Sequence, residues 1–325
     1  MRTRQDIELL EDKVLAPYAM KSKDSGGRNY QEDQHDVRTC YQRDRDRIVH
    51  CEAFRKLEYK TQVFVIFEGD YYRTRLTHTI EVAQIARTIG RALSLNEDLI
   101  EAVALAHDLG HPPFGHAGED VLNAIIGEVG LKFNHNQRSF DIVTQFEKRY
   151  PDFDGLNLSK EVLVGILKHS TIYDHPGDSH YNAFLDEGTV LEAKVVDIAD
   201  SLAYLSHDID DGMTAGCITK DDLSESHLWQ KAYKRVEHSV GMEKKEMFKY
   251  QIVKALIDMQ MKDLLSFSGQ SLKDFNFSSS EDVKKYNHLA PLHNPYNIKG
   301  IELAKQVFKD VDQYIVFDTG YYKTL

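Results

Sequence analysis

The sequence predicts an all-α protein with one small β-hairpin arm. In RTRLTHTIEVAQIARTIGRAL the inward-facing positions His78, Val82, Ile85 and Ile89 recur at steps of 4, 3 and 4, as one face of a helix requires. An unbroken apolar stripe repeats at the same period over residues 190–211. Strands and helices do not alternate along the chain, which argues against a doubly wound sheet.

Helices are expected, in chain order, wherever this period recurs. Asn96 followed by Glu97 and Asp98 is typical of a helix start, because acidic side chains stabilise the positive end of a helix. The run QVFVIF at 62–67, ended by EGD, is the best strand candidate and predicts the hairpin arm. Further helices are predicted at about 43–60, 117–127, 137–149, 160–169, 225–240, 244–266 and 298–312.

The loops divide this helical pattern into a core and an extension. Turn residues mark loops at 150–159 and 170–189, and the Ser-rich stretch 266–282 is typical of a linker or flexible loop. We therefore expect a helical core over residues 1–220 and a helical C-terminal extension over 221–325, packed on that core.

The composition excludes several classes of protein. Three cysteines, Cys40, Cys51 and Cys217, lie far apart without a CxxC spacing, which argues against a disulfide framework and a cysteine zinc site. No stretch approaches the ~20 apolar residues of a membrane span, and the first residues lack the apolar run of a signal peptide. We expect a soluble, cytoplasmic protein without a membrane partner.

The charge of the chain disfavours a general nucleic-acid-binding surface, because the net charge is −12. The distribution is uneven, since residues 38–75 hold nine Lys or Arg against six Asp or Glu. This basic segment could line an anion pocket or bind single-stranded DNA. The alternative is a solvated, self-paired face, for which RDRDR at 43–47 is the model.

The stretch AHDLGHPPFGHAGED at 106–120 gathers three histidines and three acids. Gly110 and the pair Pro112-Pro113 should end the preceding helix and turn the chain. His107 lies on the apolar face of that helix and should point inward, where its nitrogens and the Asp108 carboxylate both need partners. A bound divalent metal would be a partner for both the imidazole and the carboxylate. The alternative is a polar corner between two helices.

Two other helices could complete such a metal site. His78 faces inward from the preceding helix, although a lone inward histidine is more often a satisfied core residue. One side of the 190–211 helix carries only aspartates and a tyrosine, a crowding that is unfavourable without a cation: Asp197, Asp200, Tyr204, Asp208 and Asp211. A mixed nitrogen and oxygen set suits Mn, Fe, Co, Ni or Zn rather than calcium.

His116 and Glu119 suggest acid–base chemistry beside this metal site. They are three residues apart, so they share one face of the next helix, and a histidine oriented by a carboxylate is a general acid–base arrangement. His111 lies in the turn before them. The alternative is a helix-start carboxylate beside an exposed histidine.

Five motifs follow one another over residues 14–216: APYAMKSKDSGGR, KTQVF, RTRLTHTIEVAQ, AHDLGHPPFGHAGED and VVDIADSLAYLSHDIDDG. Together they resemble the deoxyguanosine triphosphate triphosphohydrolase (dGTPase) family of HD-domain proteins. The resemblance implies an HD-domain helical core. Two departures concern FNHNQRS, where the family reads close to FEHNxQS, and Lys194, where a glutamine is common.

The resemblance implies a role for each candidate residue. The implied metal ligands are His78, His107, Asp108 and Asp200. The implied catalytic pair is His116 and Glu119, to which we add His111. The implied substrate contacts are Gln62, Tyr204 and Asp208 on the sugar side and Arg75, His135 and Lys168 at the phosphates.

The implied reaction is hydrolysis of dGTP or other dNTPs to a deoxynucleoside and tripolyphosphate, with Mg²⁺ accompanying the triphosphate. Other HD-type activities stay open, namely a nucleoside monophosphatase or a phosphodiesterase, as does a non-catalytic module that binds nucleotides or single-stranded DNA. Relatives in the family form tetramers or hexamers, so we expect a homo-oligomer. The sequence leaves base preference, a nucleotide activator and the native metal open.

Overall fold

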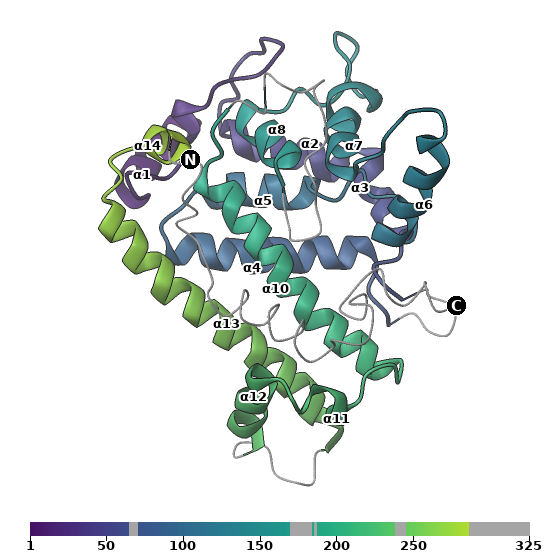
Figure 1. Cartoon of the computed structure of the whole chain (residues 1–325). Coiled ribbons are helices and arrows are strands. Elements are labelled where there is room, and N and C mark those ends of the chain that lie inside the picture. The colour runs from purple at the N-terminus through teal and green to yellow at the C-terminus, as the bar shows by residue number, and fades with distance from the viewer. Residues whose placement is uncertain (65–70, 170–183, 185–186, 238–244, 286–325) are drawn as a thin grey trace.

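The computed structural model describes residues 1–64, 71–169, 184, 187–237 and 245–285. Regular structure within these ranges is almost entirely helical, which confirms the all-α prediction. Helix α4 (Arg75–Ala92) runs through the middle of the molecule beside α5 (Glu97–Ala106), and α10 (Leu191–Thr214) crosses both (Figure 1). The candidate site residues come mainly from these three helices and from the turn that follows α5.

The remaining elements surround this crossing. The N-terminal part of the chain forms α1 (Arg4–Val14), the 3₁₀ turn η1 (Ser22–Asp24), α2 (Cys40–His50), α3 (Glu52–Lys56) and the 3₁₀ turn η2 (Leu57–Tyr59). Of these, α2 packs against α5. The middle of the chain forms α6 (Gly115–Gly127), α7 (His135–Asp141), the π-helical turn η3 (Ile142–Phe146) and α8 (Lys160–Leu167). The C-terminal part forms α11 (Lys220–Leu223), α12 (His227–Glu237), α13 (Lys245–Phe275) and α14 (Ser280–Lys285).

Capping explains where several helices begin. The Asn96 side chain accepts hydrogen bonds from the backbone of Asp98 and Leu99, so the predicted start of α5 is confirmed. The helix expected at 43–60 is divided instead, because Cys51 adopts an extended conformation between α2 and α3. The Cys51 sulfur then accepts a hydrogen bond from Phe54 N (3.3 Å) and begins the second helix.

The linker predicted at 266–282 is wrong, because α13 continues to Phe275 and α14 follows. Leu264, Ser268 and Leu272 are buried at steps of four residues, and both leucines belong to the main hydrophobic cluster. Burial of this stripe outweighs the low helix propensity of its serines and glycine. The helix predicted at 298–312 lies outside the described residues.

The predicted hairpin arm falls mostly on residues 65–70, outside the described part of the chain. Its base is described: Thr61 and Thr74 form one antiparallel bridge, and Arg75 N donates to Lys60 O (3.0 Å). These two contacts bring the KTQVF segment to the start of α4, beside the candidate site.

Two buried clusters hold the helices together. The main cluster is built on α4, α5, α8 and α10 and also takes in Phe277 and Val283 from the predicted C-terminal extension. A second cluster packs Ile209 of α10 against Trp229 of α12 and Leu256 of α13. The expected boundary near residue 220 stays a prediction. Among the described helices, none combines the length and the apolar character that crossing a membrane requires.

Glu192 joins the segment around Met20, which follows α1, to the starts of α5 and α10. Its side chain is completely buried at the start of α10, where Oε1 accepts hydrogen bonds from the backbone N–H groups of Met20 (2.9 Å) and Asn96 (3.1 Å). Burial raises the pKa of this carboxyl group from 4.5 to about 7. Between pH 4.5 and about pH 7, the Glu192 carboxyl group is therefore protonated in the folded protein but largely ionised in the unfolded chain.

This carboxyl group should make stability depend on pH. Between pH 4.5 and about 7 the folded state holds more protons than the unfolded state, so the free energy of unfolding should fall as pH rises. Glu192→Gln keeps an acceptor oxygen but removes the titration. Relative to wild type, the variant should gain on the order of 2–4 kcal/mol between pH 4.5 and pH 8, measured by urea unfolding. An equal difference between the two proteins at both pH values would contradict this assignment.

Candidate active site

Three helices bring the four predicted metal ligands together. His78 lies on α4, His107 and Asp108 follow α5, and Asp200 lies on α10. His78 Nε2 is 3.0 Å from Asp200 Oδ1 and 3.7 Å from Asp108 Oδ2, while His107 Nε2 is 3.4 Å from Asp108 Oδ1 and 4.0 Å from Asp200 Oδ1. The spacing of these atoms fits a set of nitrogen and oxygen ligands around one ion.

The His107 ring is oriented as a metal ligand would be. Its Nδ1 lies 2.6 Å from Ala104 O, so Nδ1 carries the hydrogen and donates it. Nε2 then presents a lone pair, is fully buried, and has no hydrogen-bond partner among the described residues. A lone pair that faces two carboxylates is unfavourable unless a cation lies between them, so the donor set fits a divalent metal.

The electrostatic environment keeps the ligands in their metal-binding forms. Burial lowers the pKa of His107, so its imidazole stays neutral. Burial alone would raise the pKa of Asp108, but His107 and Arg75 hold it well below its usual range. For Asp200 the hydrogen bond from His169 likewise outweighs burial and lowers the pKa.

Two buried histidines that the sequence interpretation missed contact these ligands. His207 Nε2 lies 2.7 Å from His78 Nδ1, so His207 can accept the Nδ1 hydrogen and leave His78 Nε2 for a metal. His169 lies between Asp197 (2.8 Å) and Asp200 (3.3 Å). Although burial alone would lower the pKa of His169, its hydrogen bonds to these two carboxylates raise it well above the usual value.

Basic side chains of the protein pair with aspartates near the end of α10. Arg73 Nη1 pairs with Asp211 (2.5 Å) and Asp210 (3.1 Å), and Lys249 also pairs with Asp210 (2.6 Å). Protein side chains therefore relieve much of the crowding that the sequence attributed to a missing cation. Asp200 is the member of this row that faces the two ligand histidines.

A second group of histidines lies beside the first. The rings of His111 and His135 stack with centroids 4.0 Å apart, and the His116 ring stands edge-on, 4.9 Å from His111 and 5.5 Å from His135. His111 Nε2 is 3.7 Å from Asp108 Oδ1, so Asp108 lies between the two groups. Three imidazoles at this point could bind a phosphate oxygen or exchange a proton with it.

Glu119 contacts this group through His135. We expected Glu119 to hold His116, but the contact that the structure establishes joins Glu119 Oε2 to His135 Nδ1 (2.8 Å) and Oε1 to His135 N (3.1 Å). The carboxylate thus fixes the orientation of His135 and connects α6 to α7. The pairing of Glu119 with His116 stays a prediction.

The turn after α5 is shaped by a close backbone approach. A Cβ atom on Gly110 would lie 2.3 Å from both His135 O and Ser139 N, so only glycine lets this turn reach α7. Phe114 then adopts a left-handed conformation (φ 67°) before α6, a strain that lies between His111 and His116. The local backbone is therefore adapted to bring the three histidines together.

Two cations lie next to the ligand group. The Arg75 guanidinium is buried and donates from Nη1 to Asp108 Oδ2 (2.9 Å); its role at the phosphates stays a prediction. Lys60, which the sequence interpretation missed, donates from Nζ to Leu109 O (3.0 Å). Burial, reinforced by Arg75, lowers the pKa of Lys60 to about 8. Its position in KTQVF, two residues before Gln62, was the available signal.

The other predicted substrate contacts come from the segment before α4, from the end of α8 and from α10. Gln62 is buried, and its Oε1 accepts no hydrogen bond within the part of the chain that is described. Asp208 is also buried, on α10 with Tyr204. Lys168 donates from Nζ to the backbone carbonyl of Glu187. The substrate roles of all four residues stay predictions.

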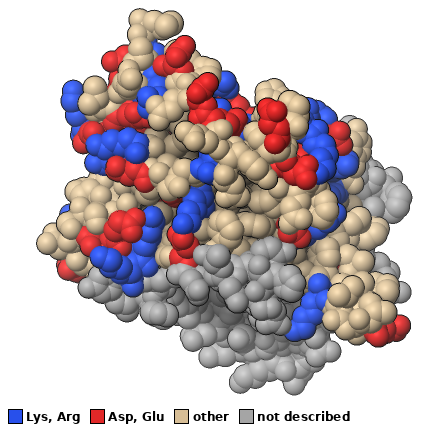
Figure 2. Space-filling view, turned by 90° about the horizontal axis from the view of Figure 1, so that it is seen from above, with Lys and Arg blue, Asp and Glu red and all other residues tan. Residues whose placement is uncertain are grey.

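The basic segment at 38–75 proves to be largely self-paired. Arg45 pairs with Asp98 (3.1 Å) and Glu101 (3.2 Å), and Arg47 pairs with Glu32 (2.7 Å). On the face shown in Figure 2, Lys and Arg side chains lie intermixed with Asp and Glu. This pattern favours a self-paired face over a binding surface for single-stranded DNA.

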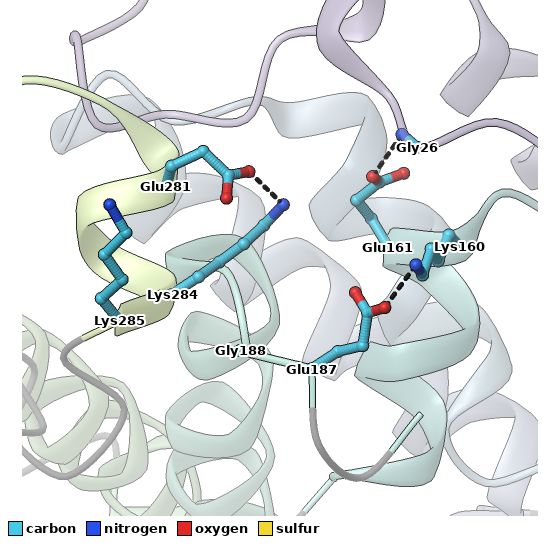
Figure 3. Close-up of a pocket in the computed structure, with 8 residues that line it drawn as sticks. All are labelled: Gly26, Lys160, Glu161, Glu187, Gly188, Glu281, Lys284 and Lys285. Atoms are coloured by element: carbon cyan, nitrogen blue, oxygen red, sulfur yellow. Dashed lines mark hydrogen bonds and ion pairs between the residues drawn. The ribbon is translucent and has the colours of Figure 1, made fainter. Parts of the chain in front are cut away.

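A surface cavity of about 490 Å³ lies elsewhere (Figure 3). It is lined by Gly26, Lys160, Glu161, Glu187, Gly188, Glu281, Lys284 and Lys285, none of which is a predicted site residue. Its charges largely satisfy one another: Lys160 pairs with Glu187, and Lys284 with Glu281 (2.7 Å). The buried histidines and carboxylates, rather than this pocket, are the candidate active site.

Two family models match parts of the chain. A family model described as HD domain matches residues 75–205, a range that includes all four predicted metal ligands. A second model, of the acetokinase family, matches residues 276–325, which contain none of the site residues.

The chain is also similar to curated proteins named deoxyguanosinetriphosphate triphosphohydrolase-like protein. The relative from Geobacter sulfurreducens is 48% identical over 287 residues, covering 88% of this chain and 74% of the relative. The relative from Syntrophus aciditrophicus is 51% identical over 238 residues, covering 72% and 59%. The relative from Leptospira interrogans (strain Fiocruz L1-130) is 41% identical over 285 residues, covering 86% and 73%.

Proposed function

Because this chain belongs to the deoxyguanosinetriphosphate triphosphohydrolase-like proteins, and so to the HD-domain phosphohydrolases, we propose that it is a metal-dependent dNTP triphosphohydrolase. The substrate would be dGTP or several dNTPs, and the products a deoxynucleoside and tripolyphosphate. The observation that carries the proposal is the convergence of the buried His78, His107 and Asp108 with the half-buried Asp200, beside three further histidines.

The proposed metal ligands are His78, His107, Asp108 and Asp200. The buried Nε2 of His107, which has no hydrogen-bond partner among the described residues, supports this choice. A divalent ion such as Mn, Fe, Co, Ni or Zn would supply Lewis acidity toward an α-phosphate oxygen. His207 would hold the tautomer of His78 that leaves Nε2 facing the site.

The group of His111, His116 and His135 would donate or accept protons during the reaction. An oxygen of water forms a bond to the α-phosphorus, the bond from phosphorus to the 5′-oxygen breaks, and the 5′-oxygen takes up a proton. The attacking water loses a proton in the same reaction. We propose that His116, which stands at the edge of the His111–His135 stack, either accepts the proton from the water or donates the proton to the 5′-oxygen. Glu119 would keep His135 oriented toward the phosphates.

Cations and polar groups would bind the rest of the nucleotide. Arg75 already lies 2.9 Å from Asp108, so a small movement of its guanidinium would reach an α-phosphate oxygen. Lys168 is proposed for the remaining phosphates, which would carry Mg²⁺. Gln62, Tyr204 and Asp208 are proposed to recognise the deoxyribose; the buried Oε1 of Gln62 offers an acceptor for a sugar hydroxyl.

Product analysis tests this proposal directly. The protein is incubated with each of the four dNTPs, alone and in mixtures, with Mn²⁺ or Mg²⁺, and the products are separated by chromatography. We expect a deoxynucleoside and tripolyphosphate in equal amounts. Release of orthophosphate or pyrophosphate would indicate another type of phosphohydrolase, and the absence of turnover with bound nucleotide would indicate a nucleotide-binding protein. Activity that appears only in mixtures would reveal a nucleotide activator.

Substitution of His116 tests its role as a proton-transfer group. His116→Ala should lower kcat by about 10²–10⁴-fold, as is typical for loss of a general acid or base, while metal content stays unchanged. His50→Ala, which removes an exposed histidine at the end of α2, serves as the control and should keep wild-type turnover. Loss of metal in His116→Ala would instead make His116 a ligand.

A further inference from the structure

We propose that His169 is a positioning residue for the metal site, and that Asp197 acts on the metal through it. The inference rests on the proposed function, which places a divalent ion at Asp200. His169 is 4% exposed and lies two residues after the end of α8. Its Nδ1 lies 2.8 Å from Asp197 Oδ1 and its Nε2 lies 3.3 Å from Asp200 Oδ2. One imidazole thus joins a predicted ligand to a carboxylate outside the ligand group.

The two oxygens of Asp200 have different partners. Oδ2 accepts from His169, whereas Oδ1 lies 3.0 Å from His78 Nε2 and 4.0 Å from His107 Nε2. His169 therefore fixes the rotation of the carboxylate and directs one oxygen to the ion. Without this contact Asp200 could rotate about its terminal bond, and ligand geometry would be lost.

The spacing on α10 explains how one ring can bridge both carboxylates. Asp197 and Asp200 are three residues apart, so they project from the same side of the helix. Lys194, one turn earlier, lies 3.4 Å from the other Asp197 oxygen and extends the network to Lys194–Asp197–His169–Asp200. Each contact in this row orients the next.

The backbone of His169 is held in place from two sides. Asn136 of α7 donates from Nδ2 to His169 O (2.7 Å). Helix α8 also packs closely, since a Cβ atom on Gly165 would lie 2.9 Å from Val103 Cγ2 and 3.3 Å from Ala193 Cβ. This rigidity makes His169 a fixed support for Asp200.

Direct ligation by His169 is the competing arrangement. Ligand atoms of His107, His169 and Asp200 lie within 4.8 Å of one another, so the distances permit it. However, both His169 nitrogens already face carboxylate oxygens, and its Nε2 is bonded to Asp200 Oδ2, whereas His78 and His107 contact Oδ1. The contacts thus favour action through Asp200.

The test measures metal binding, independently of turnover. Mn²⁺ affinity is determined by electron paramagnetic resonance for wild type, His169→Gln, Asp197→Asn and the double variant, with His50→Gln as an exposed-histidine control. His169→Gln should bind Mn²⁺ about 10–100-fold more weakly, as is typical when an outer support of a ligand is lost. Asp197→Asn should also bind more weakly. The double variant should be no weaker than His169→Gln, because Asp197 acts through the ring.

Other results would overturn either the inference or the proposed function. Mn²⁺ affinity within about twofold of wild type in folded His169→Gln overturns the inference; should that variant not fold, the same result in Asp197→Asn overturns it. X-ray absorption spectra of the wild type and His169→Gln should show equal numbers of imidazole ligands, and one fewer in the variant would make His169 a ligand. A wild type that binds no metal would instead reject the proposed function itself.

Discussion

The convergence of two carboxylates and two imidazoles, three of them buried and Asp200 half-buried, between α4, α5 and α10 is the constraint on which the rest depends. Buried charges are costly unless they are paired or bound to a metal. Asp108 and Asp200 are therefore surrounded by cationic or hydrogen-bonding groups, among them Arg75 and His169. The glycine turn at 110, the capped start of α5 and the crossing of α10 all serve to hold this group together.

The parts predicted from sequence are those that follow from local periodicity. His78 and His107 could be assigned to inward faces because each lies on an apolar helical stripe, and Asp200 lies on the acidic side of a long helix. His169 and His207 could not be found in this way. Each acquires its role from a partner distant in sequence, Asp200 or His78, and a lone histidine carries no such information. The linker prediction at 266–282 failed for the same reason, since burial against distant helices decided the outcome.

Asp108 lies between two chemically different groups of side chains. On one side lie the proposed metal ligands, and on the other the stacked His111 and His135 with His116 at their edge. A phosphate placed between them would contact a Lewis acid and a proton-transfer group at once, an arrangement suited to phosphoryl chemistry. The proposed substrate contacts Arg75, Tyr204 and Asp208 lie on α4 and α10, the helices that also carry His78 and Asp200, so nucleotide binding there would be coupled to the geometry of this centre.

The most direct test of this account is an anomalous-difference map from crystals grown with Mn²⁺. The account predicts one strong peak at about 2.0–2.2 Å from His78 Nε2, His107 Nε2 and an oxygen each of Asp108 and Asp200. A map without a peak there, or with its main peak among His111, His116 and His135, would contradict it.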